Sequence, residues 1–213
     1  PNPEDSKAWT LALELAKEKD ADIVLATDPD ADRLGVYAKD EKTGEYVSFT
    51  GNMSGSLIAE YILREKKEKG ELPENAAIVE TIVTTDMLKA VAEKYGVKLM
   101  EVLTGFKFIG EQIKLFEQNN SYEYIFGMEE SYGCLAGTYA RDKDACVAVM
   151  MLCEVAAYYK LKGRAERSRE SHTGRDAQGG QQHSPVSGRH LPADRFPVGG
   201  TVQHGRQVAG AGG

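Results

Sequence analysis

Asp28, Asp30 and Asp32 alternate within one short polar segment of the chain. They directly follow residues 23–26, a continuous apolar run that predicts a strand buried on both faces. Carboxylates at alternate positions of an irregular backbone can each give one oxygen to a hard divalent cation. Polar side chains at the carboxyl end of a strand also occupy the usual ligand position of open α/β sheets. The segment therefore predicts a metal site, beside which Arg33 could bind a phosphate oxygen.

Three other interpretations fit an acidic segment that follows a strand. An EF-hand loop requires Gly at its sixth position and Glu at its twelfth, where this chain has Arg33 and Lys39. A phosphotransferase of the haloacid-dehalogenase type also begins with Asp-x-Asp, but Asp32 stands where Thr or Val is usual. A solvated acidic turn without any ligand is the third interpretation, and this segment alone does not exclude it.

Two glycines bracket a second polar segment, residues 127–133, which reads GMEESYG. Within it, Glu129 and Ser131 combine a carboxylate acceptor with a hydroxyl, and such a pair can bind neighbouring hydroxyl groups of a sugar. A helix cap or a solvated turn is the alternative for an isolated Glu-x-Ser. The side chain of Glu130, between them, could point into the site or away from it.

Cationic side chains that could contact a phosphate occur in two further segments. Residues 104–107 read TGFK, and residues 141–144 read RDKD. Lys107 could bind phosphate or take part in proton transfer, although a solvated helix lysine is equally compatible with the sequence. Arg141 and Lys143 could contact phosphate or could only serve the start of the following helix.

Apolar periodicity places these polar segments among alternating strands and helices. The patterns predict helices at about 4–19, 57–62, 87–96, 106–116 and 144–161, and strands at 23–26, 77–83, 97–103 and 122–126. Residues 34–38 and 46–49 flank a polar stretch with Thr43-Gly44 and predict a hairpin. Strands that alternate with helices of this length predict an α/β fold built of layered helices and sheets.

Charge and composition change abruptly near Gly163. Residues 1–162 hold 19 Lys and Arg against 29 Asp and Glu, whereas residues 163–213 hold 7 against 4. All four His and 11 of the 22 Gly also lie in the second part. Because this part has too few apolar residues to offset its ordering entropy, we expect a disordered tail over 163–213. A shifted reading frame or an artificial junction is our hypothesis for its origin.

The acidic body of the chain argues against a nucleic-acid partner, which would require a basic surface. No apolar run reaches the roughly 18 residues of a membrane span, and no signal peptide opens the chain. We therefore expect no membrane partner and a cytoplasmic location.

The three cysteines, Cys134, Cys146 and Cys153, lack the spacing of a metal site or a disulfide framework. We expect reduced thiols that pack as small apolar residues in a core. Cys146 and Cys153 are seven residues apart in a helical pattern, which predicts that they share one face of the helix.

Residues 21–36, ADIVLATDPDADRLGV, closely resemble the magnesium loop of the α-D-phosphohexomutases, the phosphoglucomutase/phosphomannomutase family. Residues 104–107 resemble the TGFK segment of its phosphoglucomutase-like branch, and residues 127–133 resemble its sugar-recognition loop. The RDKD at 141–144 is similar to the start of a helix in this family. Residues 1–4, PNPE, resemble the segment that leads into its metal-binding domain. The segments stand in the family's order, so the chain is identified as a member.

The resemblance implies layered α/β/α domains of the phosphohexomutase type. Residues 1–48 would be the C-terminal part of the metal-binding domain 2, and residues 49–162 most of the sugar-binding domain 3. Domains 1 and 4 of the same enzyme, with the phosphorylated serine and a loop that grips the substrate phosphate, would then be missing partners. For this reason we do not expect activity from the chain alone.

The resemblance also implies a function. The chain would be part of an isomerase that interconverts hexose 1-phosphate and hexose 6-phosphate through an enzyme phosphoserine and a bisphosphate intermediate. Asp28, Asp30 and Asp32 would bind Mg²⁺, and Arg33 and Lys107 would be catalytic. The substrate-binding residues would be Thr104, Gly105, Glu129, Ser131, Arg141 and Lys143. The alternatives are an inactive magnesium- or phosphosugar-binding fragment and a haloacid-dehalogenase-type phosphotransferase. The TGFK and EESYG segments favour glucose phosphate over mannose or pentose phosphate.

Overall fold

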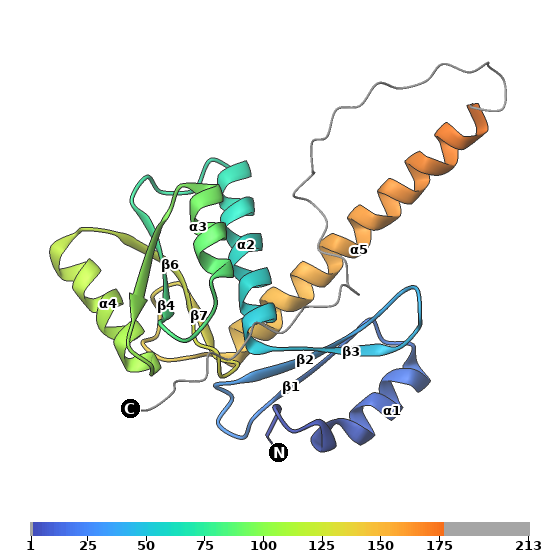
Figure 1. Cartoon of the computed structure of the whole chain (residues 1–213), viewed down its shortest axis with the longest axis horizontal. Helices are drawn as coiled ribbons and strands as arrows, with labels where there is room; N and C mark the ends of the chain where they lie inside the picture. Colours follow the sequence, from blue (N-terminus) through green and yellow to red (C-terminus); the bar gives the residue numbers. More distant parts are fainter. Residues whose placement is uncertain (1, 177–213) are drawn as a thin grey trace, which may run out of the picture.

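The computed structural model describes residues 2–176, with side chains as far as residue 163. Within this part the strands form two sheets, of order β1-β2-β3 and β5-β4-β6-β7 (Figure 1). The elements are η1 (Ser6–Trp9), α1 (Thr10–Lys19), β1 (Ile23–Thr27), β2 (Leu34–Lys39), β3 (Tyr46–Phe49), α2 (Gly51–Glu68), β4 (Ala76–Thr81), α3 (Met87–Tyr95), β5 (Lys98–Val102), α4 (Phe106–Asn119), β6 (Glu123–Met128), β7 (Cys134–Ala136) and α5 (Ala145–Asp176).

The first sheet is an antiparallel meander with the acidic segment at one end. β1 and β2 pair as far as Thr27 and Leu34, so residues 28–33 form the loop of a hairpin. Helix α1 covers one face of this sheet (Figure 1). Trp9, 2% exposed, packs there so closely that a Cβ added at Gly35 would lie 2.5 Å from its ring. This packing fixes the strand that follows the loop.

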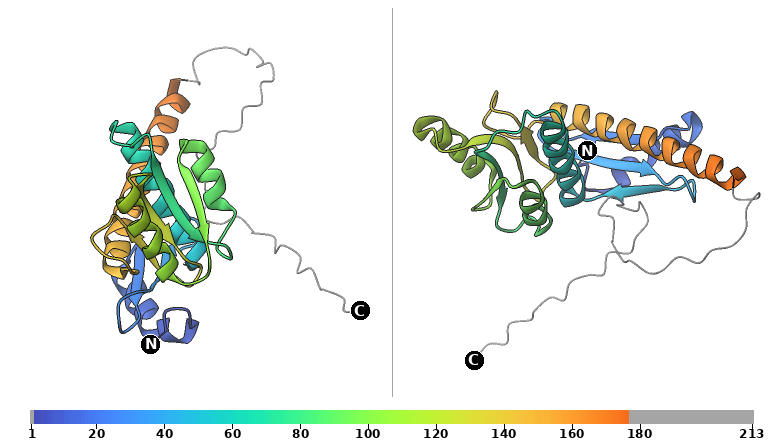
Figure 2. Two further views of the ribbon diagram at one scale, coloured as in Figure 1. Left: turned by 90° about the vertical axis from the view of Figure 1, so that its left-hand side faces the viewer. Right: turned by 90° about the horizontal axis from the view of Figure 1, so that it is seen from above.

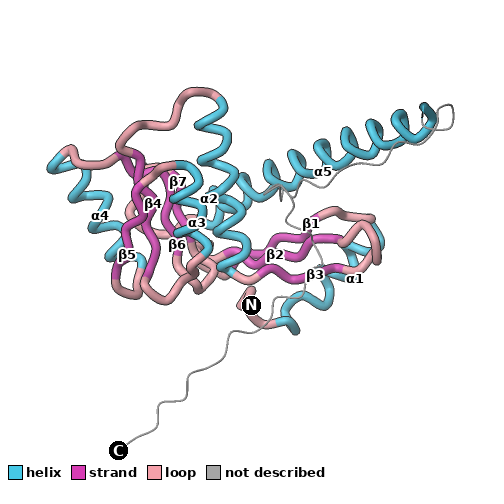
Figure 3. Tube along the Cα trace, turned by 45° about the horizontal axis from the view of Figure 1, so that its top comes forward, coloured by secondary structure: helices cyan, strands magenta, loops and turns pink. Residues whose placement is uncertain are grey.

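The second sheet is the middle layer of an α/β/α sandwich. Strands β4, β5 and β6 are parallel, and β7 pairs with β6 in the antiparallel sense. Helices α2 and α3 lie on one face and α4 on the other (Figure 3). Ile78 of β4 packs with the first pair of helices, whereas Ala77 and Val79 pack with α4. These layers confirm the predicted α/β fold class.

Helix α5 connects the two sheets. It contacts β7 of the second sheet and then β1 and β2 of the first, and its far end extends beyond them (Figure 2). Its N-terminus is capped by Asp144, whose Oδ1 accepts a hydrogen bond from Cys146 N at 2.7 Å. None of the helices within residues 2–176 combines the length and apolar character needed to cross a bilayer.

The C-terminal end of the fold differs from the prediction. The periodicity predicts a helix end at about 161 and disorder from 163, but α5 is helical through Asp176. Gly163 costs only about 1 kcal/mol inside a helix. Once formed, a helix propagates readily into good helix formers such as the Arg, Ala and Glu of 164–167. The rest of the predicted tail, 177–213, lies outside the described residues.

Two strands also differ from their predictions. β7, for which the sequence predicts no strand, follows the polar segment 127–133 and has three residues, too few to show a period. β1 is half-buried along its whole length instead of buried on both faces. The reason is its position, because among the described strands β1 is at the edge of its sheet, with β2 on one side.

The cysteines divide into one buried and two exposed thiols. Cys134 is buried, as expected, and burial raises the pKa of its thiol to about 12. Cys146 and Cys153 are exposed, so the expectation that they pack in a core is wrong. The spacing of seven cannot show whether the shared face of a helix is turned to the core or to solvent.

Candidate functional site

The three aspartates converge in the loop between β1 and β2. One carboxylate oxygen from each of Asp28, Asp30 and Asp32 lies within 4.8 Å of the other two. Asp28 Oδ1 accepts hydrogen bonds from the backbone N–H groups of Asp32, at 3.1 Å, and Arg33, at 3.0 Å. These bonds fold the loop back on its first residue and bring together the predicted metal ligands.

The loop favours the ionised form of Asp28 and leaves one carboxylate oxygen of Asp32 without a partner. Burial alone would raise the pKa of Asp28, but the hydrogen bonds from the backbone of Arg33 and Asp32 outweigh it and lower the pKa. Asp32 Oδ1 is buried without a hydrogen-bond partner among the described residues, although Arg33 Nε lies 3.8 Å away. Such a group costs about 1–3 kcal/mol when unsatisfied. A divalent cation would satisfy it, and Mg²⁺ prefers carboxylate oxygens, so the residues fit this ion.

The predicted sugar loop is the turn of the hairpin between β6 and β7. Glu129 N donates a hydrogen bond to Gly133 O at 3.0 Å and closes the turn. Ser131 Oγ donates to Glu129 Oε1 at 3.0 Å, so the carboxylate and the hydroxyl lie on the same side of the loop. A polyhydroxylated ligand could replace this internal bond with its own hydroxyl groups.

Lys143 joins the two loops. Its Nζ lies 2.9 Å from Asp32 Oδ2 and 3.4 Å from Glu129 Oε1. Burial alone would lower its pKa, but the hydrogen bond to Asp32 and the charges of Glu129 and Asp142 raise it, so the side chain remains an ammonium. Gly133 makes room for it, because an added Cβ would lie 2.1 Å from Lys143 Cδ. The metal loop and the sugar loop are therefore neighbours.

Backbone hydrogen bonds hold both loops in an uncommon conformation. Ala31 and Tyr132, one in each loop, have positive φ angles of 57° and 64°. Their carbonyl oxygens accept the bonds that join the elements: Ala145 N donates to Ala31 O at 2.9 Å, and Leu34 N donates to Tyr132 O at 3.0 Å. Non-glycine residues in this region are strained and often occur at functional sites.

Arg33 lies at the edge of the metal loop. One guanidinium nitrogen is 3.2 Å from Glu4 Oε1, and Nε is 4.0 Å from Asp28 Oδ2. The side chain is 38% exposed, so it can still reach a ligand phosphate. Glu4 was not among the predicted site residues. Its position in the segment PNPE, which resembles the family, was the only sequence feature that could have indicated it.

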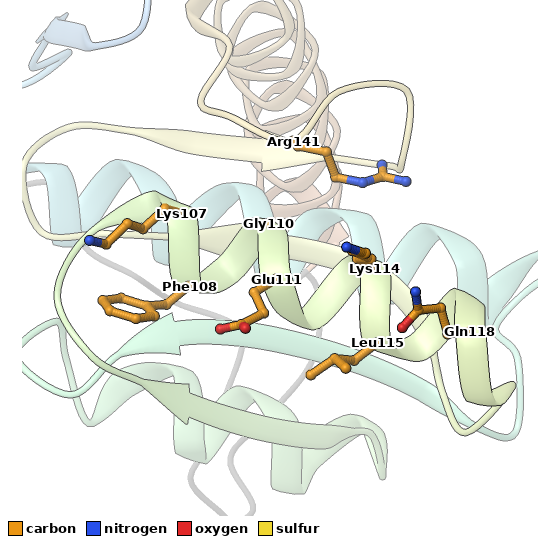
Figure 4. A pocket seen from close by; sticks show the side chains of 8 residues that line it. All are labelled: Lys107, Phe108, Gly110, Glu111, Lys114, Leu115, Gln118 and Arg141. Carbon is orange, nitrogen blue, oxygen red and sulfur yellow. The ribbon is translucent and has the colours of Figure 1, made fainter.

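Lys107 and Arg141 lie elsewhere, along the exposed side of α4. They line an open pocket of about 560 Å³ together with Lys114 and Gln118 (Figure 4). One guanidinium nitrogen of Arg141, Nη2, lies 2.7 and 2.6 Å from the two carboxylate oxygens of Glu117, and this ion pair anchors the guanidinium to α4. No hydrogen bond or ion pair within the described residues joins Lys107 or Arg141 to the acidic loop. Their predicted contacts to substrate stay predictions.

Thr104 and Gly105 connect the end of β5 to the start of α4. Gly105 has a φ of 115°, which side chains rarely adopt, and its carbonyl accepts a hydrogen bond from Phe108 N at 3.0 Å. β4 lies between β5 and β6 in the parallel part of the sheet, so this segment and the sugar loop emerge at the same edge. Two strand spacings separate them by about 10 Å, a distance that one hexose phosphate can bridge.

The fold and the site define a layered α/β protein with an acidic loop, the candidate metal site, beside a candidate sugar-binding turn. Two family models match it: "Phosphoglucomutase/phosphomannomutase, alpha/beta/alpha domain II" over residues 1–43 and "alpha/beta/alpha domain III" over residues 50–172. The second match alone covers more than half of the chain. The chain therefore belongs to the phosphoglucomutase/phosphomannomutase family, whose members are phosphohexomutases.

Two curated relatives agree with this membership. The chain is 44% identical over 165 residues to a phosphoglucomutase of Staphylococcus epidermidis, covering 76% of this chain and 29% of the relative. It is 38% identical over 163 residues to a phosphoglucomutase of Staphylococcus aureus, covering 76% and 28%. The chain thus spans under a third of the length of these relatives.

Two solved structures show the same fold. A putative phosphomannomutase from Thermus thermophilus matches with a TM-score of 0.58 at 24% identity, over 74% of this chain and 32% of that one. A Paramecium phosphoglucomutase in an open form matches with a TM-score of 0.52 at 24% identity, over 75% and 26%.

Proposed function

We propose that this chain forms the metal-binding and sugar-binding parts of a phosphohexose mutase that interconverts hexose 1-phosphate and hexose 6-phosphate. By family resemblance the reaction uses a phosphoserine of the enzyme and passes through a sugar bisphosphate, and the given sequence spans under a third of the length of its phosphoglucomutase relatives. Glucose phosphate is the substrate that we favour, because the two staphylococcal relatives are phosphoglucomutases.

The position of Lys143 between Asp32 and Glu129 carries this proposal. It places the acidic loop and the Glu-x-Ser turn around one half-buried ammonium group. A site for phosphoryl transfer on a sugar needs a cation site and hydroxyl-binding groups next to each other. A haloacid-dehalogenase-type site has no need of the second loop, and no contact among the described residues favours that alternative.

Each residue of the site has a role that follows from its contacts. Asp28, Asp30 and Asp32 would hold Mg²⁺, which when bound neutralises charge on the phosphoryl group. Glu129 and Ser131 would bind paired sugar hydroxyls, and because one only accepts while the other also donates, the sugar can bind in either direction. Binding in both orientations is required because the bisphosphate must reorient in the site between the two phosphoryl transfers.

The cationic residues would bind phosphate at two distances from the metal. Arg33, at the edge of the acidic loop, would contact the phosphoryl group near the cation. Lys107 and the Thr104-Gly105 turn would contact the far end of the sugar phosphate from the carboxyl end of β5. Arg141 is paired with Glu117, so we propose it as a contact that forms only when a ligand phosphate replaces that carboxylate.

A coupled assay for conversion of glucose 1-phosphate to glucose 6-phosphate tests the proposal. The isolated chain is expected to show no turnover. A chimera in which residues 2–162 replace the matching segment of the Staphylococcus epidermidis relative should turn over, and Asp30→Asn in it should lose about a hundredfold in rate. A folded, magnesium-binding chimera that is inactive on glucose and mannose phosphates would refute the proposal, and turnover by the isolated chain would refute the need for further segments.

A further inference from the structure

The turn that follows β4 has its polar and apolar residues in inverted positions. Thr81 and Thr84 are 1% and 7% exposed, whereas Ile82 and Val83, between them, are 58% and 55% exposed. Apolar burial alone would favour the opposite arrangement. The orientation of this turn must therefore depend on what the two threonine hydroxyls bind.

The hydroxyls form a short relay that ends on the sugar loop. Thr81 Oγ1 donates a hydrogen bond to Glu130 Oε2 at 3.0 Å, and the Oγ1 atoms of Thr81 and Thr84 are 2.7 Å apart. A carboxylate only accepts, so the Thr81 proton goes to Glu130 and the Thr84 hydroxyl must donate to Thr81. A bond to an ionised acceptor is about twice as strong as one between neutral groups.

The turn itself is held on both sides. Thr84 N donates to Thr81 O at 2.9 Å. The peptide group between residues 84 and 85 is clamped, because Asn52 Nδ2 donates to Thr84 O at 2.7 Å and Thr85 N donates to Glu80 Oε2 at 3.4 Å. The hydrogen bonds on both sides thus hold the threonine pair in place next to the sugar loop.

The threonine pair binds the sugar loop at Glu130. This residue lies between Glu129 and Ser131, the two candidate sugar contacts. Glu130 turns away to Thr81, while the carboxylate of Glu129 bonds Ser131 and Lys143. The backbone of the loop is also close to α2, since a Cβ added at Gly51 would lie 2.4 Å from Glu130 O. The two adjacent glutamates therefore have different roles. Glu129 contacts other residues of the candidate site, whereas Glu130 contacts Thr81 outside it.

We propose that Thr81 and Thr84 are positioning residues, which hold Glu130 and thereby the conformation of loop 129–133 in which Glu129 and Ser131 face a sugar phosphate. The identity of that ligand rests on the proposed function, whereas the hold on the loop does not. Neither threonine touches the ligand, so both act through Glu130.

Hydrogen exchange in the chain 1–213 tests the hold on the loop. Thr81→Val removes the hydroxyl at nearly constant volume, and Thr81→Ser keeps it as the matched control. The amides of Glu129 and Leu34, which bond the loop carbonyls of Gly133 and Tyr132, should exchange about tenfold faster in the valine variant. They should keep the wild-type rate in the serine variant, and Val79 in the core should not change in either.

A second variant keeps the test valid if Thr81→Val does not fold. Glu130→Gln, at the surface loop, keeps an acceptor for Thr81 but loses the charge, and should speed exchange at Glu129 and Leu34 by about threefold. Wild-type exchange at both loop amides in both the valine and the glutamine variants would overturn the proposal. So would an equal acceleration at Val79, because it would mean a general loss of stability.

Titration of glucose 1-phosphate in the presence of Mg²⁺, followed by the chemical shifts of the loop amides, tests the consequence for binding. Thr81→Val should weaken binding of glucose 1-phosphate about tenfold. Thr81→Ser, which keeps the hydroxyl, should bind it with the wild-type affinity. If the wild-type chain binds no sugar phosphate, the proposed function fails for this chain. The exchange rates still show whether Thr81 fixes the loop, because they are measured without a ligand. If Thr81→Val binds as tightly as the wild type, the positioning role is overturned.

Discussion

Asp30→Asn is expected to weaken Mg²⁺ binding by this chain at least about tenfold, because it removes one of the three anionic ligands that we propose. The metal-free variant should be no less stable than the wild type. Asp30 is exposed, and its loss relieves repulsion among carboxylates whose oxygens lie within 4.8 Å of one another. Calorimetric titration with Mg²⁺ gives the affinity, and thermal unfolding in a chelator gives the stability.

A neighbouring acid provides the matched control for this effect. Asp142 is 3.8 Å from Lys143 Nζ, and its side chain is 76% exposed, so Asp142→Asn removes a similar charge without touching the ligand set. We expect its Mg²⁺ affinity to stay within about twofold of the wild type, because an exposed charge is screened. Equal losses in both variants would mean that Mg²⁺ responds to the general charge of the surface and not to a site.

Glu80→Gln is expected to stabilise the chain above pH 7 by about 3 kcal/mol and to change little near pH 4.5. Glu80 is 3% exposed, and burial raises the pKa of its carboxyl from 4.5 to about 7. The nearby acids Glu101 and Asp86 raise this pKa further, while the hydrogen bond from Thr85 N lowers it. Glutamine can accept the same bond and carries no charge.

The sign follows from the protons bound in each state. Between pH 4.5 and 7 the unfolded chain has lost the Glu80 proton and the folded chain keeps it, so the stability of the wild type falls as the pH rises. The slope is about 1.4 kcal/mol per pH unit, and Glu80→Gln lacks it. Urea unfolding at pH 4.5, 6 and 8 measures the difference, with Glu93→Gln, an exposed glutamate of α3, as the control. A difference between variant and wild type that is independent of pH would show that Glu80 ionises normally.

Local patterns were sufficient to predict most elements of the fold. Helix α3 shows why, because its apolar spacing marks the buried face and Gly96 ends it in the left-handed conformation, with a φ of 71°. The hairpin of β2 and β3 was likewise predictable from its flanking strands and its turn. β7 and the extension of α5 were missed because one is too short for a period and the other depends on propagation of a helix already packed on two sheets.

The candidate residues could be found from sequence, but not their arrangement. The acidic triplet is a local signal, whereas the approach of Lys143 to Asp32 joins parts of the chain that only the fold brings together. The opposite orientations of Glu129 and Glu130 also depend on tertiary contacts, namely Lys143 on one side and Thr81 on the other. Family resemblance could name such residues, and the structure supplies the physical reason for their proximity.

The central claim is that one cation site lies next to the sugar loop, and paramagnetic Mn²⁺ in place of Mg²⁺ tests it most directly. Added to the isotope-labelled chain, Mn²⁺ should broaden the amide signals of residues 28 and 30–33 first and those of Glu129 and Gly133 next. The amide signal of Asn119, the last residue of α4, should stay sharp. Excess Mg²⁺ should reverse the broadening. Broadening that begins elsewhere on the acidic surface, or that spares the sugar loop, would contradict the account.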